Sequence, residues 1–257
     1  MAKAISDLKS KRNNFDMLIE IVDARAINIS SNKELLKDFN LPILTIAVKS
    51  DIAEINSSND LLYISTKNKS HRQIVLNKIK EILKPKIESK KKKGLINPQF
   101  NILVLGLPNI GKSSFINFVL NRNNLVVQNY PGVTRKQTLV KIDNMLFLND
   151  SPGILFKRIE DLQTGYILGL IGCIKKDVLP MYEVIKFGYE FYLSYYQSNI
   201  FNKFNLNQKL TFNDFLNHIC KQYKFIKSDN QIDSARALDY LYGIFMNGEI
   251  CKVDYEK

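Results

Sequence analysis

The sequence predicts an α/β fold, with a mainly parallel sheet and flanking helices, followed by a smaller all-helical region. Three observations predict it. Short apolar runs alternate with segments of helical period in the first 165 residues, a strand–glycine loop–helix unit follows residue 100, and strand patterns fade after Gly165. Strands separated by helices are typical of parallel sheets whose two faces are both covered. We therefore expect two domains, at residues 1–165 and 166–257.

The first half of the α/β region contains three compact apolar runs, each ending in polar or charged residues. These predicted strands are 17–22, 43–48 and 61–64. A helical period lies between the first two at 32–40, and another follows the third at 71–83. Residues 84–99 break the pattern with prolines, a glycine and four consecutive lysines, and they predict an exposed linker.

The second half begins with a strand at 100–105 and a helix running through Leu120. Residues 139–142 and 145–148 then predict a hairpin around an Asp-Asn turn. The region after Gly165 is rich in Tyr and Phe, which we expect mainly in a helical core.

Composition narrows the class of protein. The 257 residues are 45% hydrophobic and 24% charged, which is ordinary for a globular chain. No apolar run is long enough to span a membrane, and the first fifteen residues do not read as a secretory signal. The three scattered cysteines favour a reduced, cytoplasmic location. The net charge of +12, concentrated before residue 166, favours a polyanionic partner such as RNA. An AT-rich coding bias would raise the lysine content in the same way.

The strongest motif lies between the strand at 100–105 and the helix after it. Residues 106–113 read Gly-Leu-Pro-Asn-Ile-Gly-Lys-Ser and match the phosphate-binding P-loop pattern. Backbone N–H groups and the helix N-terminus can surround phosphate oxygens, while Lys112 reaches the β- and γ-phosphates. The candidate contacts from this segment are Asn109, Ile110, Gly111, Lys112, Ser113 and Ser114.

Three further residues fit a magnesium and γ-phosphate site. Asp150 follows a hydrophobic strand and can hold Mg²⁺ through water, and Ser113 offers Mg²⁺ a hydroxyl. Thr134, between them in Pro-Gly-Val-Thr, can supply a second hydroxyl in a switch loop. Gly153 can direct a backbone N–H to the γ-phosphate.

A guanine-binding carboxylate is predicted upstream of the P-loop. Asp51 can accept hydrogen bonds from N1–H and the exocyclic amine, and the Lys49 stem can cover the ring. Ser65 or Thr66 can donate a backbone N–H to O6. The full candidate set at this end is Val48, Lys49, Ser50, Asp51, Ser65 and Thr66. Alternatively, Lys49 and Asp51 are solvated loop charges.

A rival Lys-Lys-Asp at 175–177 lies downstream of the P-loop, but it follows Asp150 too closely to leave room for the intervening helices and strands. The base-recognition residues therefore precede the phosphate-binding ones. Such a circular permutation keeps all of them at the C-terminal edge of a parallel sheet, where ligands bind in open α/β folds.

With this order, the chain resembles the circularly permuted P-loop GTPases of the YlqF/RbgA family over nearly its whole length. The resemblance also rests on Met-Ala-Lys-Ala at 1–4, Asp-Ala-Arg at 23–25, Asp-Ser-Pro-Gly-Ile-Leu at 150–155 and the segment 172–180. It implies GTP hydrolysis coupled to late maturation of the large (50S) ribosomal subunit, with the helical domain contacting rRNA. It also implies a K⁺ ion near the phosphates, bound by Asn109.

The chain departs from the family at the base and at the catalytic position. Val48 replaces an Asn, so guanine preference should persist through Asp51 in weakened form. Thr66 replaces an Ala, which is harmless if its backbone N–H contacts the base. The family's proposed catalytic His precedes Met-Ala-Lys-Ala, outside this chain, and Ile154 stands where other GTPases place a water-orienting Gln. The catalytic residue is thus unknown, and we expect slow intrinsic hydrolysis.

Three functions therefore remain open. The chain is predicted to be a monomeric, cytoplasmic GTPase that assembles the large ribosomal subunit, using GTP/GDP, Mg²⁺ and K⁺ and binding rRNA but no membrane. Its alternatives are a nucleotide-dependent ribosome-binding module with negligible turnover and a P-loop ATPase unrelated to RNA. Candidate rRNA phosphate contacts lie three residues apart on a predicted helix, at Lys221, Lys224 and Lys227.

Overall fold

The computed structural model describes residues 6, 10, 12–55, 61–121, 138–151, 159, 161–227 and 231–257. The chain forms two compact units. The first comprises Met1–Asp51 and Ile55–Arg158, and the second comprises Ile52–Glu54 and Ile159–Lys257. Within the described part of the chain, no helix is both long and apolar enough to cross a bilayer.

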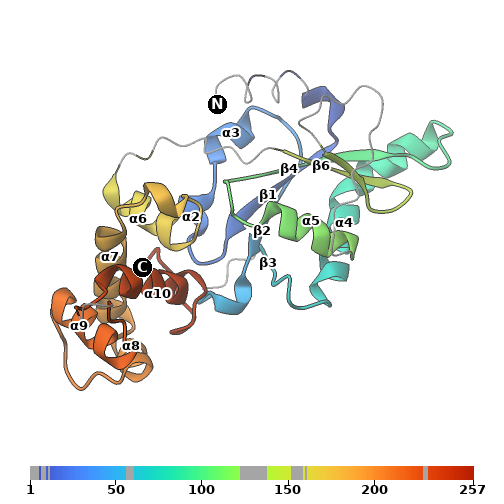
Figure 1. Ribbon diagram of the computed structural model, residues 1–257. Helices are drawn as coiled ribbons and strands as arrows, with labels where there is room; N and C mark the ends of the chain where they lie inside the picture. Colours follow the sequence, from blue (N-terminus) through green and yellow to red (C-terminus); the bar gives the residue numbers. More distant parts are fainter. Residues whose placement is uncertain are drawn as a thin grey trace. The chain divides into compact units, whose positions relative to one another are not determined.

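The first unit is built on a six-stranded sheet in the order β3-β2-β1-β4-β6-β5 (Figure 1). All neighbouring strands pair in parallel except β5, which pairs antiparallel with β6. This confirms the predicted parallel sheet and the hairpin. The strands are β1 (Met17–Asp23), β2 (Ile43–Val48), β3 (Leu62–Tyr63), β4 (Phe100–Gly106), β5 (Thr138–Lys141) and β6 (Leu146–Asp150).

The apolar character of β1 follows from its place between β2 and β4. Every residue of β1 is buried, because helices cover both faces of a central parallel strand. Glu20 is one of two charged residues in β1, with Asp23, and its Oε1 accepts hydrogen bonds from Ser31 Oγ (2.9 Å) and the Asn32 backbone N–H (2.8 Å). These donors make burial of the carboxylate tolerable. They also join β1 to the short helices α2 (Ile27–Ser30) and α3 (Lys33–Lys37).

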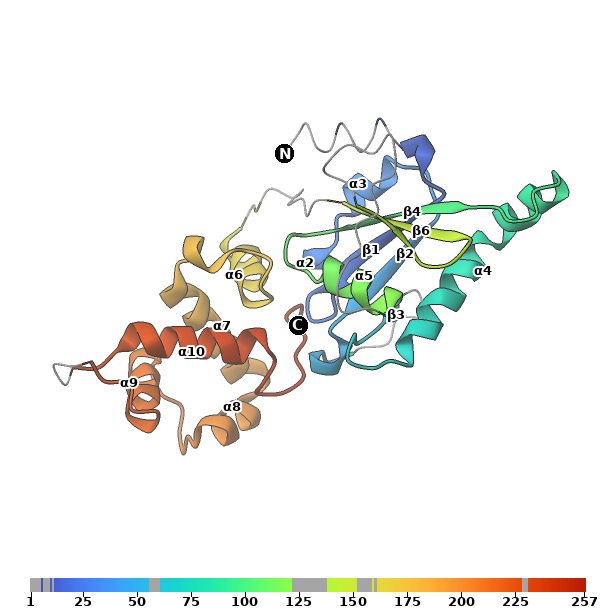
Figure 2. The same ribbon diagram turned by 45° about the vertical axis from the view of Figure 1, so that its right-hand side comes forward.

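The prediction of a linker at 84–99 is wrong in its first half. Helix α4 runs from His71 to Lys92 and continues through Pro85 (Figure 2). Two of its lysines are anchored on the sheet: Lys86 Nζ donates to the Asp16 carbonyl at 2.7 Å, and Lys90 Nζ lies 4.2 Å from the centroid of Phe100. Lysines in the last turn also interact favourably with the helix dipole. These contacts offset the proline and the like charges.

The second unit is helical and has an aromatic core. Tyr189 stacks on Phe215 with ring centroids 4.2 Å apart, and Tyr192 stacks on Phe245 at 5.3 Å. All four rings are buried, which confirms the predicted packing role of these aromatics. The helices are α6 (Leu162–Leu170), α7 (Met181–Tyr195), α8 (Gln197–Phe204), α9 (Phe212–Gln222) and α10 (Ser234–Met246).

The predicted basic row on one helix is wrong. Lys221 lies in the last turn of α9, which ends at Gln222. Lys224 adopts a left-handed backbone conformation with φ 54°, so it cannot continue the helix. Lys227 follows in an extended segment, where its backbone N–H donates to the Gln231 carbonyl at 2.8 Å. The three-residue spacing therefore does not place these side chains on a common helix face.

Candidate nucleotide-binding site

The P-loop connects β4 to helix α5 (Lys112–Leu120) and is shaped by its glycines. Gly106 has φ +156°, and a Cβ on it would lie 2.7 Å from the Ile21 carbonyl oxygen, so only glycine allows this approach. Asn109 and Gly111 also have positive φ, at 55° and 117°. Ile110 is fully buried and holds the loop against the unit.

Lys112 begins α5 directly after the P-loop, and its side chain turns back into the loop. Its Nζ donates to the carbonyl oxygens of Gly106 (3.0 Å) and Leu107 (2.8 Å), and the side chain is buried. Ser113 and Ser114 follow it, exposed, in the first turn of α5. A buried ammonium, exposed hydroxyls and a helix N-terminus thus converge, and this combination suits phosphate oxygens.

Asp150 ends β6 beside the P-loop strand, paired in register with Val104. Burial raises the pKa of its carboxyl, and the nearby Lys112 charge partly opposes this effect. Among the described residues, its buried Oδ1 has no hydrogen-bond partner. An unpaired, buried carboxylate oxygen is costly, and a hydrated magnesium ion would satisfy it. The next residue is fixed by a 2.7 Å hydrogen bond from Ser151 Oγ to the Val104 carbonyl.

The predicted switch residues Thr134 and Gly153 lie outside the described residues, as do Ile154 and Met-Ala-Lys-Ala at 1–4. The rival Lys-Lys-Asp at 175–177 lies in the second unit. There Lys176 and Asp177 belong to a 3-10 turn, and Lys176 Nζ forms a 2.8 Å ion pair with Asp239.

The base-recognition residues lie at the ends of β2 and β3. Asp51 occupies a 3-10 turn, Ser50–Ile52, and its Oδ2 accepts from Lys67 Nζ at 2.7 Å. Burial tends to raise the pKa of Asp51, but hydrogen bonds from Lys67 and Ser65 outweigh it, so the pKa is lowered. Asp51 is therefore an ionised acceptor at neutral pH.

Of the two backbone donors predicted for a guanine O6, one already has a partner. The Ser65 backbone N–H donates to His71 Nδ1 at 2.9 Å. This contact ties the segment after β3 to the start of α4. Thr66, which is exposed, is then the better candidate for a donor to a base.

The base-recognition loop and the P-loop are neighbours. Strands β2 and β4 flank β1, and all three run parallel, so their C-terminal ends meet at one edge of the sheet. Val48 is buried there, and its Cγ2 lies 3.8 Å from the position of a Cβ built on Gly111. Residues 48 and 111, 63 positions apart in the chain, thus lie close together. The substituted Val48 packs on the P-loop where an asparagine would offer a polar contact.

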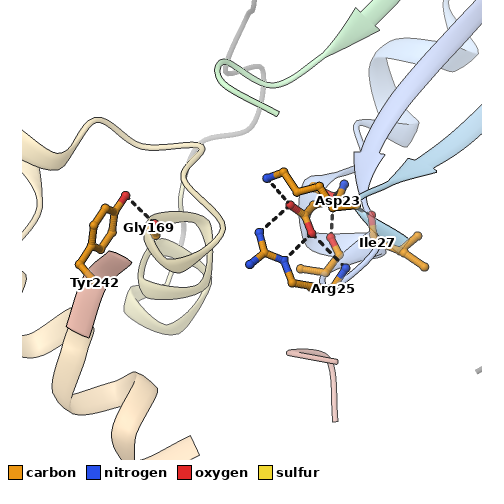
Figure 3. A network of polar contacts seen from close by, with 8 residues as sticks. Asp23, Arg25, Ile27, Gly169 and Tyr242 are labelled. Carbon is orange, nitrogen blue, oxygen red and sulfur yellow. Dashed lines mark hydrogen bonds and ion pairs between the residues drawn. The ribbon is translucent and has the colours of Figure 1, made fainter. Parts of the chain in front are cut away.

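A buried ion cluster supports this edge, and the sequence reasoning assigned it no role at the site. Asp23, at the end of β1, is fully buried and accepts at 2.9 Å from both Arg25 Nε and Arg25 Nη2 (Figure 3). Its Oδ2 also accepts from Lys49 Nζ at 2.8 Å. Burial favours the neutral acid, but the Arg25 and Lys49 charges outweigh it and lower the pKa of Asp23 from 3.8 to about 2. The signal was available: an acid ending a buried strand, with an arginine two residues later.

This cluster fixes the loop between β2 and Asp51. Lys49 has a left-handed backbone with φ 62°, which is unfavourable for a lysine. Its ion pair to a buried carboxylate compensates for that conformation. The Lys49 stem is thereby held close to the residues proposed to contact the base.

Asp23→Asn should strongly destabilise the first unit, because it removes the negative charge that Asp23 places against the fully buried Arg25. Loss of one partner of a buried pair costs about 3–5 kcal/mol. The low Asp23 pKa also stabilises the fold above pH 4, by about 2 kcal/mol, and this contribution disappears as the pH falls from about 4 to 2. Urea unfolding at pH 7 and pH 3 measures both effects.

The control for this substitution is Glu81→Gln, which removes an exposed ion pair with Lys78. Exposed pairs contribute little, so we expect a change of at most about 0.5 kcal/mol. Equal stability of Asp23→Asn and Glu81→Gln would contradict the structural role of the cluster.

Asp150→Asn should stabilise the ligand-free protein and weaken Mg²⁺ binding. Because burial raises the Asp150 pKa, ionisation of this carboxyl opposes folding once the pH exceeds its unfolded value of about 3.8. A neutral amide removes that cost. It also removes an outer ligand for Mg²⁺, which typically costs about 10–100-fold in metal affinity. Thermal unfolding with GDP, with and without Mg²⁺, measures both, and an undiminished Mg²⁺-dependent rise in Tm would contradict the assignment.

The fold and the site define a class: a P-loop nucleotide-binding protein whose base-recognition strands precede its phosphate-binding strand. Comparisons with known proteins agree. The family model described as "50S ribosome-binding GTPase" matches residues 101–179. The chain is 33% identical, over its whole length and 93% of the relative, to the probable ribosome biogenesis GTPase A of Mycoplasma pneumoniae. It is 31% identical to ribosome biogenesis GTPase A of Priestia megaterium, over 81% of this chain and 77% of the relative.

The chain therefore belongs to the ribosome biogenesis GTPase A family, also known as the YlqF/RbgA family, and it is a GTPase. Its fold also matches GDP-bound TM YlqF, with a TM-score of 0.66 and 20% identity over 98% of both chains. A GNP-bound YlqF from T. maritima gives a TM-score of 0.67 at 18% identity, over 98% of this chain and 97% of that one. These relatives favour GTP and GDP, used with Mg²⁺, over the ATPase alternative.

Proposed function

We propose that this GTPase is a cytoplasmic, monomeric assembly factor of the large ribosomal subunit. In this proposal it binds rRNA, and its helical unit responds to the bound nucleotide. The observation that carries the nucleotide part is the proximity of Val48 and Gly111 at one edge of the sheet, which brings the base-recognition loop beside the P-loop. The ribosomal part is supported by relatives named for ribosome biogenesis, by the "50S ribosome-binding" family model and by the net charge of +12.

The phosphates are proposed to bind at the N-terminus of α5. Lys112 would exchange its carbonyl partners for phosphate oxygens, a stronger, charge-assisted interaction. Backbone N–H groups of the loop would complete the cradle. The proposed phosphate contacts are Asn109, Ile110, Gly111, Lys112, Ser113, Ser114 and Gly153.

The residues proposed to hold magnesium are Ser113 and Thr134 through their hydroxyls and Asp150 through water. When bound, the ion neutralises charge on the phosphates. The unpaired Asp150 Oδ1 fits this donor set.

The guanine is proposed to bind between the ends of β2 and β3. Asp51 would accept from N1–H and the 2-amine, and Thr66 would donate its backbone N–H to O6. Lys49, held by Asp23, would cover the ring. Ser50 and Ser65 flank the carboxylate, and Val48 closes the pocket on the phosphate side.

No side chain of the described residues is assigned as the catalytic group, and we expect slow intrinsic hydrolysis. A K⁺ ion is proposed to bind near Asn109 and to assist by adding positive charge beside the phosphates. Comparing hydrolysis in KCl and NaCl at equal ionic strength tests this part, and equal rates would contradict it.

Binding to the large subunit is tested by cosedimentation. Purified large subunits should pellet the chain with a non-hydrolysable GTP analogue more than with GDP. Lys112→Ala should abolish that difference while leaving salt-sensitive background binding. Nucleotide-independent pelleting, or none, would contradict the proposal.

Since no side chain of the described residues is assigned as the catalytic group, a second candidate is a ribosome-binding module that hardly turns over. Phosphate release from GTP with subunits and K⁺ present separates the two functions. Stimulation by subunits supports the assembly GTPase, whereas an unchanged background rate supports the binding module.

A further inference from the structure

The chain changes units directly after the proposed guanine-binding residue. Asp51 belongs to the α/β unit, whereas Ile52–Glu54 belong to the helical unit. One 3-10 turn, Ser50–Ile52, contains both Asp51 and Ile52. The backbone of Asp51 is therefore one peptide bond away from a segment that packs with helices far along the chain.

Backbone contacts hold this segment in the helical unit. Ala53 forms a parallel bridge with Val253, and both residues are buried. The Val253 N–H donates to the Ile52 carbonyl at 3.2 Å, and the Glu54 N–H donates to the Val253 carbonyl at 3.1 Å. Gly248, at φ +65°, allows close packing, because a Cβ on it would lie 2.7 Å from Ile52 Cβ.

Side chains add a second set of contacts around Glu54. Its Oε2 accepts from Tyr196 Oη and from Lys257 Nζ, both at 2.7 Å. Tyr196 is buried, its Oη also accepts from the Asp254 N–H at 2.9 Å, and Lys257 Nζ lies 4.5 Å above its ring. Hydrogen bonds from and to charged groups are the stronger ones in proteins. Residues 52–54 are thus fixed through backbone, carboxylate and aromatic ring together.

By contrast, the contacts of the Asp51 side chain on its own side are local, with hydrogen bonds from Lys67, Ser65 and its own backbone. Its ion pair is with Lys67, whose side chain is 80% exposed, and exposed pairs contribute little to stability. A carboxylate that must accept two hydrogen bonds from a base needs a defined backbone position. The contacts at 52–54 can supply it.

We propose that Glu54 and Tyr196 are positioning residues for guanine recognition: by holding residues 52–54, the helical unit sets the place of Asp51 and thus the affinity for guanine nucleotides. The inference rests on the proposed role of Asp51. By linkage, a bound guanine nucleotide stabilises the same contacts in return. The guanine-binding residue Asp51 is then connected to the helical unit through Ile52–Glu54, and this connection is separate from the chain that follows Asp150.

The test compares Tyr196→Phe with Tyr195→Phe, a matched substitution at the preceding residue, which is half exposed. Dissociation constants are measured for GDP and for IDP, whose base lacks the 2-amine. Tyr196→Phe should weaken GDP binding about 5–30-fold, within the usual range of coupling between sites. It should weaken IDP binding less, so the preference for GDP over IDP falls. The KM for GTP should rise by a similar factor, with a smaller change in kcat.

Tyr195→Phe should change neither the GDP constant nor the GDP preference. Glu54→Gln should act like Tyr196→Phe. If Tyr196→Phe fails to fold, Lys257→Met serves as the second variant, because it removes one partner of Glu54 at an accessible position. A loss of thermal stability in these variants with an unchanged GDP preference would assign the contacts a purely structural role and overturn the proposal. If Asp51→Asn itself leaves base preference unchanged, the proposed base site fails instead.

Discussion

Lys112→Ala should abolish measurable GTP hydrolysis and weaken GTP binding by about 10–150-fold. The reason is the place of the ammonium, which is buried inside the P-loop within hydrogen-bonding distance of the Gly106 and Leu107 carbonyls. One charge-assisted contact to phosphate contributes about 1.5–3 kcal/mol to binding, and a lost transition-state donor costs about 10²–10³ in kcat. Calorimetric titration and phosphate release measure the two effects.

Lys91→Ala is the matched control for Lys112→Ala, because it removes an exposed lysine near the end of α4. We expect it to leave GTP binding and hydrolysis unchanged. A Lys112→Ala protein with native GTP affinity would show that the P-loop motif is not the phosphate site.

Asp51→Asn should reverse the base preference from guanine to xanthine. A carboxylate accepts from both N1–H and the 2-amine of guanine, whereas an amide has one acceptor and one donor. Xanthine carries a carbonyl at position 2, which the amide N–H can donate to. A mismatched polar group left unpaired costs about 1–3 kcal/mol, so GDP should weaken about 10–100-fold and XDP should gain by a similar factor.

Competition of GDP and XDP for a fluorescent nucleotide measures the exchange of preference. Asp16→Asn alters a carboxylate at the other end of the sheet, beside Lys86, and should leave the preference for GDP intact. Uniform weakening of GDP and XDP in Asp51→Asn would show that residue 51 acts on the fold and not on the base.

Much of the sheet could be predicted because buried parallel strands read as continuous apolar runs. The run 43–48 is β2 to the residue, and β1 and β4 each extend one residue beyond their predicted ends. The P-loop could be predicted equally well, because its glycines are needed locally. Gly106 and Gly111 adopt positive φ, and Gly106 closely approaches Ile21. Local sequence was enough in both cases.

Long-range contacts could not be read in this way. Helix α4 passes through Pro85 and a lysine run because Lys86 and Lys90 reach Asp16 and Phe100, residues far away in sequence. The Asp23–Lys49 pair joins two strands whose register no local pattern specifies. The sequence also predicted one helix for Lys221, Lys224 and Lys227. Lys224 cannot continue that helix because of its positive φ, which only the structure shows.

The central claim is that Asp51 and Lys112 bind opposite ends of one nucleotide. A crystal structure of the protein with GDP and Mg²⁺ tests it most directly. The account predicts guanine N1 within hydrogen-bonding distance of the Asp51 carboxylate and a β-phosphate oxygen within reach of Lys112 Nζ, in the same ligand. A GDP molecule that touches Lys112 while Asp51 faces another cavity would contradict it.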